Sequence, residues 1–177
     1  LDSVGSAISG NGERALKQSE RLFKSALSLR QRSLAPNHAA MSTSLENLGK
    51  VYQSQGRLAL AEPLLRQSLE TSLKTLGMER RETQVRVETF AALLVQEGKL
   101  SEARALYQRA LNPDESAGKK NTFNPSGDFL AGYAGLLVKE GRVQEALPYY
   151  ARALKVQEAS RGPQHASIAT LLDSYAY

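Results

Sequence analysis

The side chains best suited to catalysis or metal binding are few in this sequence. Its 177 residues include no cysteine and two histidines, which excludes disulfides, thiolate metal sites and cysteine nucleophiles. His38 and His165 lie 127 residues apart, each two residues after a proline. No His-x-x-x-His pair occurs, and no glutamate stands beside a histidine at helical spacing, as a zinc site on a helix requires. We expect each histidine to cap or pack at the start of a helix.

Other motifs that carry chemistry are incomplete. Gly10-Asn11-Gly12 lacks the third glycine and the lysine of a phosphate-binding loop. Asn124-Pro125-Ser126 has proline at the middle position, which excludes N-glycosylation. Aspartates and glutamates are scattered and form no acid–base pair. The sequence therefore predicts no catalytic residue, no metal and no cofactor, and a protein that is not an enzyme.

The elements that position these residues are set by an internal repeat. The segment 56–69 returns as 98–111 and again as 141–154, which are shifts of 42 and 43 residues. The two histidines are separated by three such shifts. Composition agrees with repeated helices, since Leu and Ala supply 50 positions whereas Val and Ile supply ten. We predict an all-α solenoid of antiparallel helix pairs.

Each repeat predicts two helices separated by a glycine. The first helix of the second unit spans 40–55, and Gly56, Gly98 and Gly141 stand where a left-handed residue ends such a helix. The second helices are expected at 58–76, 100–111 and 143–159, and 112–127 is expected to be a loop. Small residues recur at one position of each helix, which predicts that the paired helices pack closely. On the first helices they are Gly49, Ala91 and Ala134, and on the second helices they are Ala61, Ala103 and Ala146.

The pattern resembles the tetratricopeptide repeat, in the 42-residue variety of kinesin light chains and many bacterial scaffold proteins. The matching residues are Leu48, Gly49, Tyr52, Gly56, Ala61, Leu65 and Leu69, with Pro163-Gln164-His165 between repeats. The likeness covers residues 13–177 and implies a right-handed superhelix. We expect one repeat domain, 1–177, with units at about 1–36, 37–79, 80–123 and 124–163 and a partial unit at 164–177. The first unit departs from the pattern at Gly5, Gly10 and Gly12, so its front helix is expected to be short or frayed.

Charge is concentrated near the start of the chain. The net charge is +5, and residues 13–34 hold six Lys or Arg against two Glu. Five of these cations share one side of a predicted helix: Arg14, Lys17, Arg21, Lys24 and Arg32. We interpret this side as a solvated helix face, and the alternative is a surface that binds an anionic partner.

Two classes of partner are not expected. We expect no nucleic-acid partner, and no apolar run is long enough to cross a membrane. The chain begins without Met or a signal peptide, so we interpret it as a fragment or a processed form. The sequence does not specify the cellular compartment, and we favour the cytoplasm slightly over the periplasm.

The resemblance also implies a binding surface. In such a superhelix the first helix of each unit lines the concave wall, where positions between core residues face a ligand. The expected partner-binding residues are Thr43, Glu46, Asn47, Lys50 and Gln53, then Val85, Glu88, Ala92, Val95 and Gln96, then Asp128, Ala131, Gly135, Val138 and Lys139. The carboxylate clamp of chaperone-binding members is absent from these positions. The small and apolar middle of the wall favours an apolar segment or a helix.

These observations predict a non-enzymatic scaffold that binds a partner peptide or helix in its groove. Apolar anchors of the partner would be buried, and Asn47, Gln53 and Gln96 would pair with polar backbone groups. One alternative is a structural module that self-associates through its terminal units, because Ile168, Leu171, Leu172 and Tyr175 have no following helix to cover them. The other is a sensor domain of a larger protein.

Overall fold

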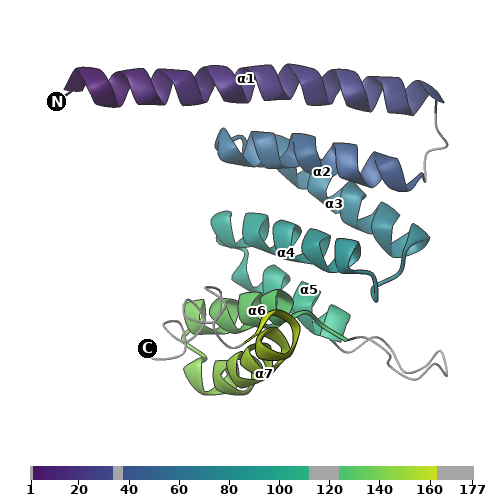
Figure 1. The fold of residues 1–177 in the computed structure, drawn as a ribbon, viewed down its shortest axis with the longest axis vertical. Helices are drawn as coiled ribbons and strands as arrows, with labels where there is room; N and C mark the ends of the chain where they lie inside the picture. The colour runs from purple at the N-terminus through teal and green to yellow at the C-terminus, as the bar shows by residue number, and fades with distance from the viewer. Residues whose placement is uncertain (1, 34–37, 112–123, 163–177) are drawn as a thin grey trace. The chain divides into compact units, whose positions relative to one another are not determined.

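The computed structural model describes residues 2–33, 38–111 and 124–162. These residues form seven α-helices, and no strand occurs in the described ranges (Figure 1). The all-α class predicted from the sequence is confirmed. By its internal contacts the chain divides into two compact units, Leu1–Leu76 and Gly77–Tyr177.

The first unit contains α1 (Asp2–Ser33), α2 (Ala39–Ser54) and α3 (Leu58–Thr75). Helix α2 packs against both α1 and α3, and consecutive helices run antiparallel (Figure 1). Its buried side chains include Leu27 of α1, Leu45 and Leu48 of α2 and Leu65 of α3. Burying this apolar surface offsets the entropy lost on folding.

The second unit contains α4 (Arg81–Gln96), α5 (Leu100–Leu111), α6 (Gly127–Lys139) and α7 (Val143–Arg161). The pairs α4–α5 and α6–α7 are helical hairpins, and α6 also contacts α4 and α5. Phe129 and Leu130 of α6 are fully buried, and the Phe129 ring meets that of Tyr107 edge to face at 4.9 Å. The α4–α6 contact positions the surface considered below.

The helix termini have the chemistry that the repeat predicts. Gly56, Gly98 and Gly141 have φ values of +71°, +76° and +77°, a conformation that costs glycine little, so each first helix ends there. The side chain of His38 caps α2, because its Nδ1 accepts a hydrogen bond from the Ala40 N–H at 3.1 Å. The structural role expected for His38 is confirmed, whereas His165 lies outside the described residues.

The predicted small residues lie where paired helices approach closely. Ala61, Ala103, Ala134 and Ala146 are fully buried, and Ala91 is nearly so. At Gly49, an added Cβ would lie 2.7 Å from two side-chain carbon atoms of Leu65. Any larger residue at that position would therefore displace the buried Leu65 side chain of α3.

The start of the chain differs from the expectation. The front helix of the first unit was expected to be short or frayed and separate from the next, but α1 is one helix that continues through Gly12. Glycine in a helix interior costs only about 1 kcal/mol relative to alanine, which a 32-residue helix tolerates. The remaining boundaries agree within about two residues, while the partial unit 164–177 and most of the predicted loop 112–127 lie outside the described residues. A single repeat domain over the whole chain stays a prediction.

Candidate functional site

The predicted partner-binding residues lie on α2, α4 and α6, the first helices of their repeats. Most are partly or fully exposed, as a binding surface requires. Glu46 is the exception, because it is only 7% exposed and forms an ion pair with Lys50 one turn along α2. The expectation that Glu46 faces a ligand is therefore not matched by its position.

A cavity of about 430 Å³ brings five of the predicted residues together. Its lining comes from α4, α5 and α6, and the five predicted members are Glu88, Ala92, Val95, Gly135 and Lys139. The remaining lining residues are Ala91, Tyr107, Gly132 and Leu136. The walls are mostly hydrocarbon, with a carboxylate and an ammonium group among them, which is the usual composition of a ligand pocket.

Glu88 is the unusual group in this cavity. Its Oε1 is buried and has no hydrogen-bond partner among the described residues. Burial raises the pKa of Glu88 to about 7, and repulsion by the Asp128 carboxylate adds to the rise while the Arg81 guanidinium opposes it. A buried acceptor without a donor is costly, so this site favours a ligand that brings one.

Tyr107 and Gly132 lie at the floor of the cavity, and the sequence did not predict a binding role for either residue. Tyr107 of α5 is 4% exposed, and its hydroxyl lies 2.7 Å from where a Cβ at Gly132 would be. Gly132 thus leaves room for the phenol, whose pKa is raised by burial, so that it remains protonated. Tyr107 stands at the repeat position of Leu65 and Tyr150, which predicted packing but not a cavity.

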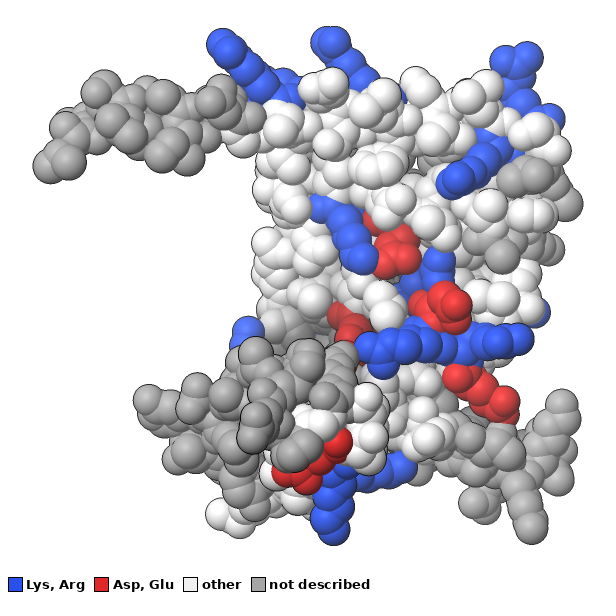
Figure 2. Space-filling view, in the orientation of Figure 1, with Lys and Arg blue, Asp and Glu red and all other residues white. Residues whose placement is uncertain are grey.

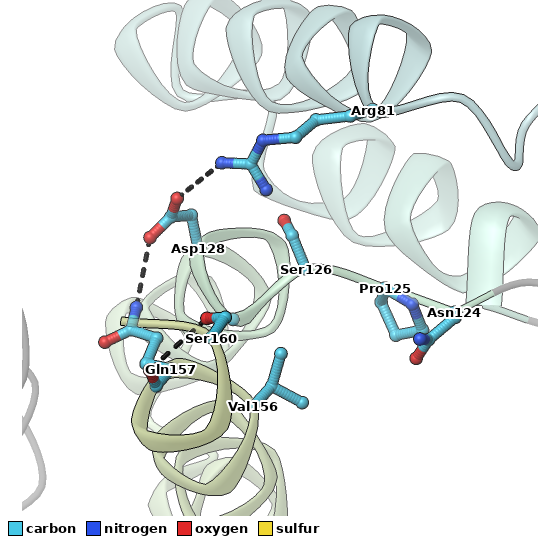
Figure 3. Close-up of a pocket in the computed structure, with 9 residues that line it drawn as sticks. Arg81, Asn124, Pro125, Ser126, Asp128, Val156, Gln157 and Ser160 are labelled. Atoms are coloured by element: carbon cyan, nitrogen blue, oxygen red, sulfur yellow. Dashed lines mark hydrogen bonds and ion pairs between the residues drawn. The ribbon is translucent and has the colours of Figure 1, made fainter. Parts of the chain in front are cut away.

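Asp128 lies in a different cavity, of about 370 Å³, at the start of α6 (Figure 3). Its carboxylate accepts from Arg81 at 2.8 Å and from the Gln157 side chain at 3.0 Å. Gln84 of α4 bonds the same segment through its side-chain amide, donating to the Asn124 carbonyl and accepting from the Ser126 N–H. These contacts fix the start of α6 against α4 and α7, so we assign Asp128 a positioning role.

The other predicted residues do not line either cavity. On α4 and α6 these are Val85 and Ala131, which are half-buried, and Gln96 and Val138, which are exposed. On α2, Thr43 and Lys50 are exposed while Asn47 and Gln53 are half-buried. The α2 residues form a polar surface of the first unit.

The basic residues of α1 are partly neutralised. Figure 2 shows Lys and Arg side chains projecting along this helix. Lys17 pairs with Glu13 and Lys24 with Glu20, both at 2.7 Å, and Lys24 also lies 5.7 Å from the Tyr52 ring centroid. The hydrogen bond from Lys24 and a second from Gln55 lower the pKa of Glu20 to about 2. The ion pairs within α1 agree with the solvated face expected for its basic residues. Lys24 differs from the others, because it also lies near Tyr52 and so bridges α1 and α2.

A third cavity, of about 590 Å³, lies beside this part of α1. It is lined by α1 residues from Gly12 to Glu20 and by Ser54, Gln55 and Arg57 near the end of α2. The carboxylate of Glu20 accepts hydrogen bonds from the side chains of Gln55 and Arg57, both at 3.1 Å. This acidic group is therefore already paired within the protein. No predicted partner-binding residue lines the cavity.

Two kinds of site are absent from the described part of the chain. No three His, Asp or Glu side chains there gather as a metal site would require. No helix in the described ranges has the length and hydropathy needed to span a membrane.

Comparisons with known proteins identify the fold. Residues 13–74, from within α1 to near the end of α3, match the family model described as Tetratricopeptide repeat. A putative kinesin light chain with nearly identical TPR-like repeats from Podosopora anserina superposes with a TM-score of 0.71 over 98% of this chain and 81% of that one, at 19% identity. The chain has the tetratricopeptide-repeat fold.

A second solved structure supports this tetratricopeptide-repeat assignment. BtubC (BKLC) from P. vanneervenii superposes with a TM-score of 0.67 at 16% identity, covering 84% of this chain and 59% of that one. A single-residue variant of the Podosopora protein gives 0.72 at 18% identity, with the same coverage as its parent. The comparison with curated proteins found no match. The resemblance inferred from the sequence to kinesin-light-chain-type tetratricopeptide repeats is confirmed, and members of this family are generally protein–protein interaction modules.

Proposed function

We propose that this protein is a non-enzymatic interaction module that binds a partner peptide or helix on the α4–α6 face. The observation that supports the proposal is the cavity that gathers Glu88, Ala92, Val95, Gly135 and Lys139 from two helices. Its apolar lining suits a buried anchor side chain, and its polar groups suit orientation of that anchor. In the first unit, the polar residues Thr43, Asn47, Lys50 and Gln53 of α2 are proposed to contact a partner on the basis of their repeat positions alone.

Affinity in this binding mode comes mainly from burial of apolar surface, with a smaller contribution from charge. An anchor that fills the cavity loses contact with water against Ala92, Val95 and Gly135, and affinity follows from that loss. Binding also orders the partner segment, so moderate affinity is expected from one such cavity. No catalytic constellation lies near it in the described residues, and the absence of an enzymatic role is part of the proposal.

Two matched substitutions test the proposal. Val95→Glu places a charge against the buried anchor and should weaken capture of a partner from cell extract at least tenfold, equivalent to about 1.4 kcal/mol. Ala105→Glu introduces the same charge at an exposed position of α5, outside the cavity lining, and should leave capture unchanged. Equal capture by both variants, each with a wild-type circular dichroism spectrum, would refute binding at this face.

Self-association is a second candidate function. Leu22 and Leu29, seven residues apart on one face of α1, are 63% and 64% exposed. Two exposed leucines on one helical face are typical of a contact surface. If this face mediates self-association, Leu22→Ser with Leu29→Ser should convert an oligomer to a monomer in light scattering across a concentration series. A wild-type mass equal to that of the monomer at every concentration would exclude this candidate.

A further inference from the structure

The α4–α6 cavity has opposite charges at its two ends. Glu88 and Ala131 occupy equivalent positions of consecutive repeats, while Lys139 stands eight residues beyond Ala131. At 1.5 Å per residue, Lys139 is about 12 Å further along α6 than Ala131, toward the other end of the lining. Between these ends the lining consists of small and apolar side chains. The cavity therefore offers an anionic end, a hydrocarbon wall and a distant cationic rim.

The groups around Glu88 define what its end of the cavity accepts. From α6, Asp128 adds negative charge but is paired with Arg81 of α4 at 2.8 Å. From α5, Tyr107 contributes a neutral phenol. Arg81 offsets part of the Asp128 charge, so the ionised carboxylate of Glu88 keeps a net negative charge around a buried oxygen atom that lacks a donor. A cationic donor satisfies both the charge and the missing hydrogen bond.

We propose that the cavity recognises a lysine side chain of the partner, with the ammonium group at Glu88 and the methylene stem along Ala92 and Val95. This inference rests on the proposed function, because it names the anchor that the α4–α6 face takes. A lysine stem is apolar and unbranched, so it matches the hydrocarbon wall while delivering three donors at its end. An arginine would bring a wide planar guanidinium, which needs more room beside the Glu88 carboxylate than the compact ammonium group of lysine does.

Protonation of Glu88 competes with this anchor. Since the pKa of Glu88 is raised to about 7, roughly nine-tenths of the carboxyl is protonated at about pH 6 and roughly nine-tenths is ionised at about pH 8. Only the ionised form attracts an ammonium group, and an amine of pKa near 10.4 stays charged at both pH values. Affinity for the anchor should therefore rise about tenfold from pH 6 to pH 8.

The test uses n-hexylammonium as the probe, with n-hexanol as the uncharged match and hexanoate as the charge-reversed one. Each is titrated into the full chain, and backbone amide shifts of Ala92, Val95 and Gly135 are followed by NMR. We expect hexylammonium to bind at least tenfold more tightly than hexanol at about pH 8, and to lose that preference in Glu88→Gln. Glu82→Gln, an exposed carboxylate on the same helix, should retain it.

The outcomes separate this inference from the proposed function. Equal binding of hexylammonium and hexanol, a preference that survives Glu88→Gln, or no saturable shift at these amides with hexylammonium would each overturn the lysine anchor. If the lysine anchor were overturned but partner capture still depended on Val95, the proposed interaction face would remain supported without a lysine anchor. If capture were independent of Val95, the proposed function itself would fail.

Discussion

Replacing Phe129 with alanine is expected to destabilise the second unit by about 3 to 5 kcal/mol. Phe129 is fully buried at the start of α6, and its ring contacts Tyr107 edge to face at 4.9 Å. Its removal deletes a large apolar side chain and leaves a cavity beside the Tyr107 ring, between α5 and α6. Tyr107, which forms the floor of the α4–α6 cavity, would lose its support at the same time.

Urea unfolding followed by circular dichroism measures this effect. Val138→Ala is the matched control, because it removes an exposed apolar side chain from the same helix and should cost less than 1 kcal/mol. Phe129→Leu should fall between the two, which keeps the comparison usable if the alanine variant does not fold. Equal midpoints for Phe129→Ala and Val138→Ala would show that α6 does not pack as described.

Replacing Glu88 with glutamine is expected to make the protein more stable at about pH 8 by about 3 to 4 kcal/mol, with the gain vanishing near pH 4. The pKa of Glu88 is raised to about 7 in the folded state, whereas an unfolded glutamate titrates near 4.3. Between these values the folded state binds more protons than the unfolded state. The stability of the wild-type protein therefore falls as pH rises through that window, and the glutamine variant lacks this contribution.

The difference in unfolding free energy between the two proteins, measured across pH, isolates this group from other carboxylates. Glu82→Gln, at an exposed carboxylate of the same helix, controls for a general loss of negative charge from α4. A flat difference for Glu88→Gln would mean that Glu88 is hydrated rather than buried in the cavity wall.

The helices and their termini were predictable because they depend on local chemistry that repeats. A glycine with positive φ at three equivalent positions fixes the end of each first helix, and a 42-residue period carries the boundaries along the chain. Buried alanines at repeated positions likewise revealed the packed faces. The single helix α1 was not predicted, since the repeat favoured a break near Gly10 and Gly12, but neither glycine forces one.

The candidate site was predictable in part for a related reason. Periodicity identifies which positions of a first helix point away from its own core, and Ala92, Val95 and Gly135 do line a cavity. Periodicity within one helix does not indicate which side chains of neighbouring helices pack against it or pair with it. The burial of Glu46 and Glu88, the pairing of Asp128 with Arg81, and the phenol of Tyr107 above Gly132 all depend on tertiary contacts between helices.

The measurement that tests the interaction face most directly is site-specific photo-crosslinking of the full chain in cell extract. A benzophenone amino acid at Ala92, in the cavity, is compared with the same group at Ala105, which is exposed on α5 and outside the lining. Binding at the α4–α6 face predicts a partner adduct from position 92 that the Val95→Glu substitution removes, and none from position 105. Adducts of equal yield from both positions, or from position 105 alone, would contradict it.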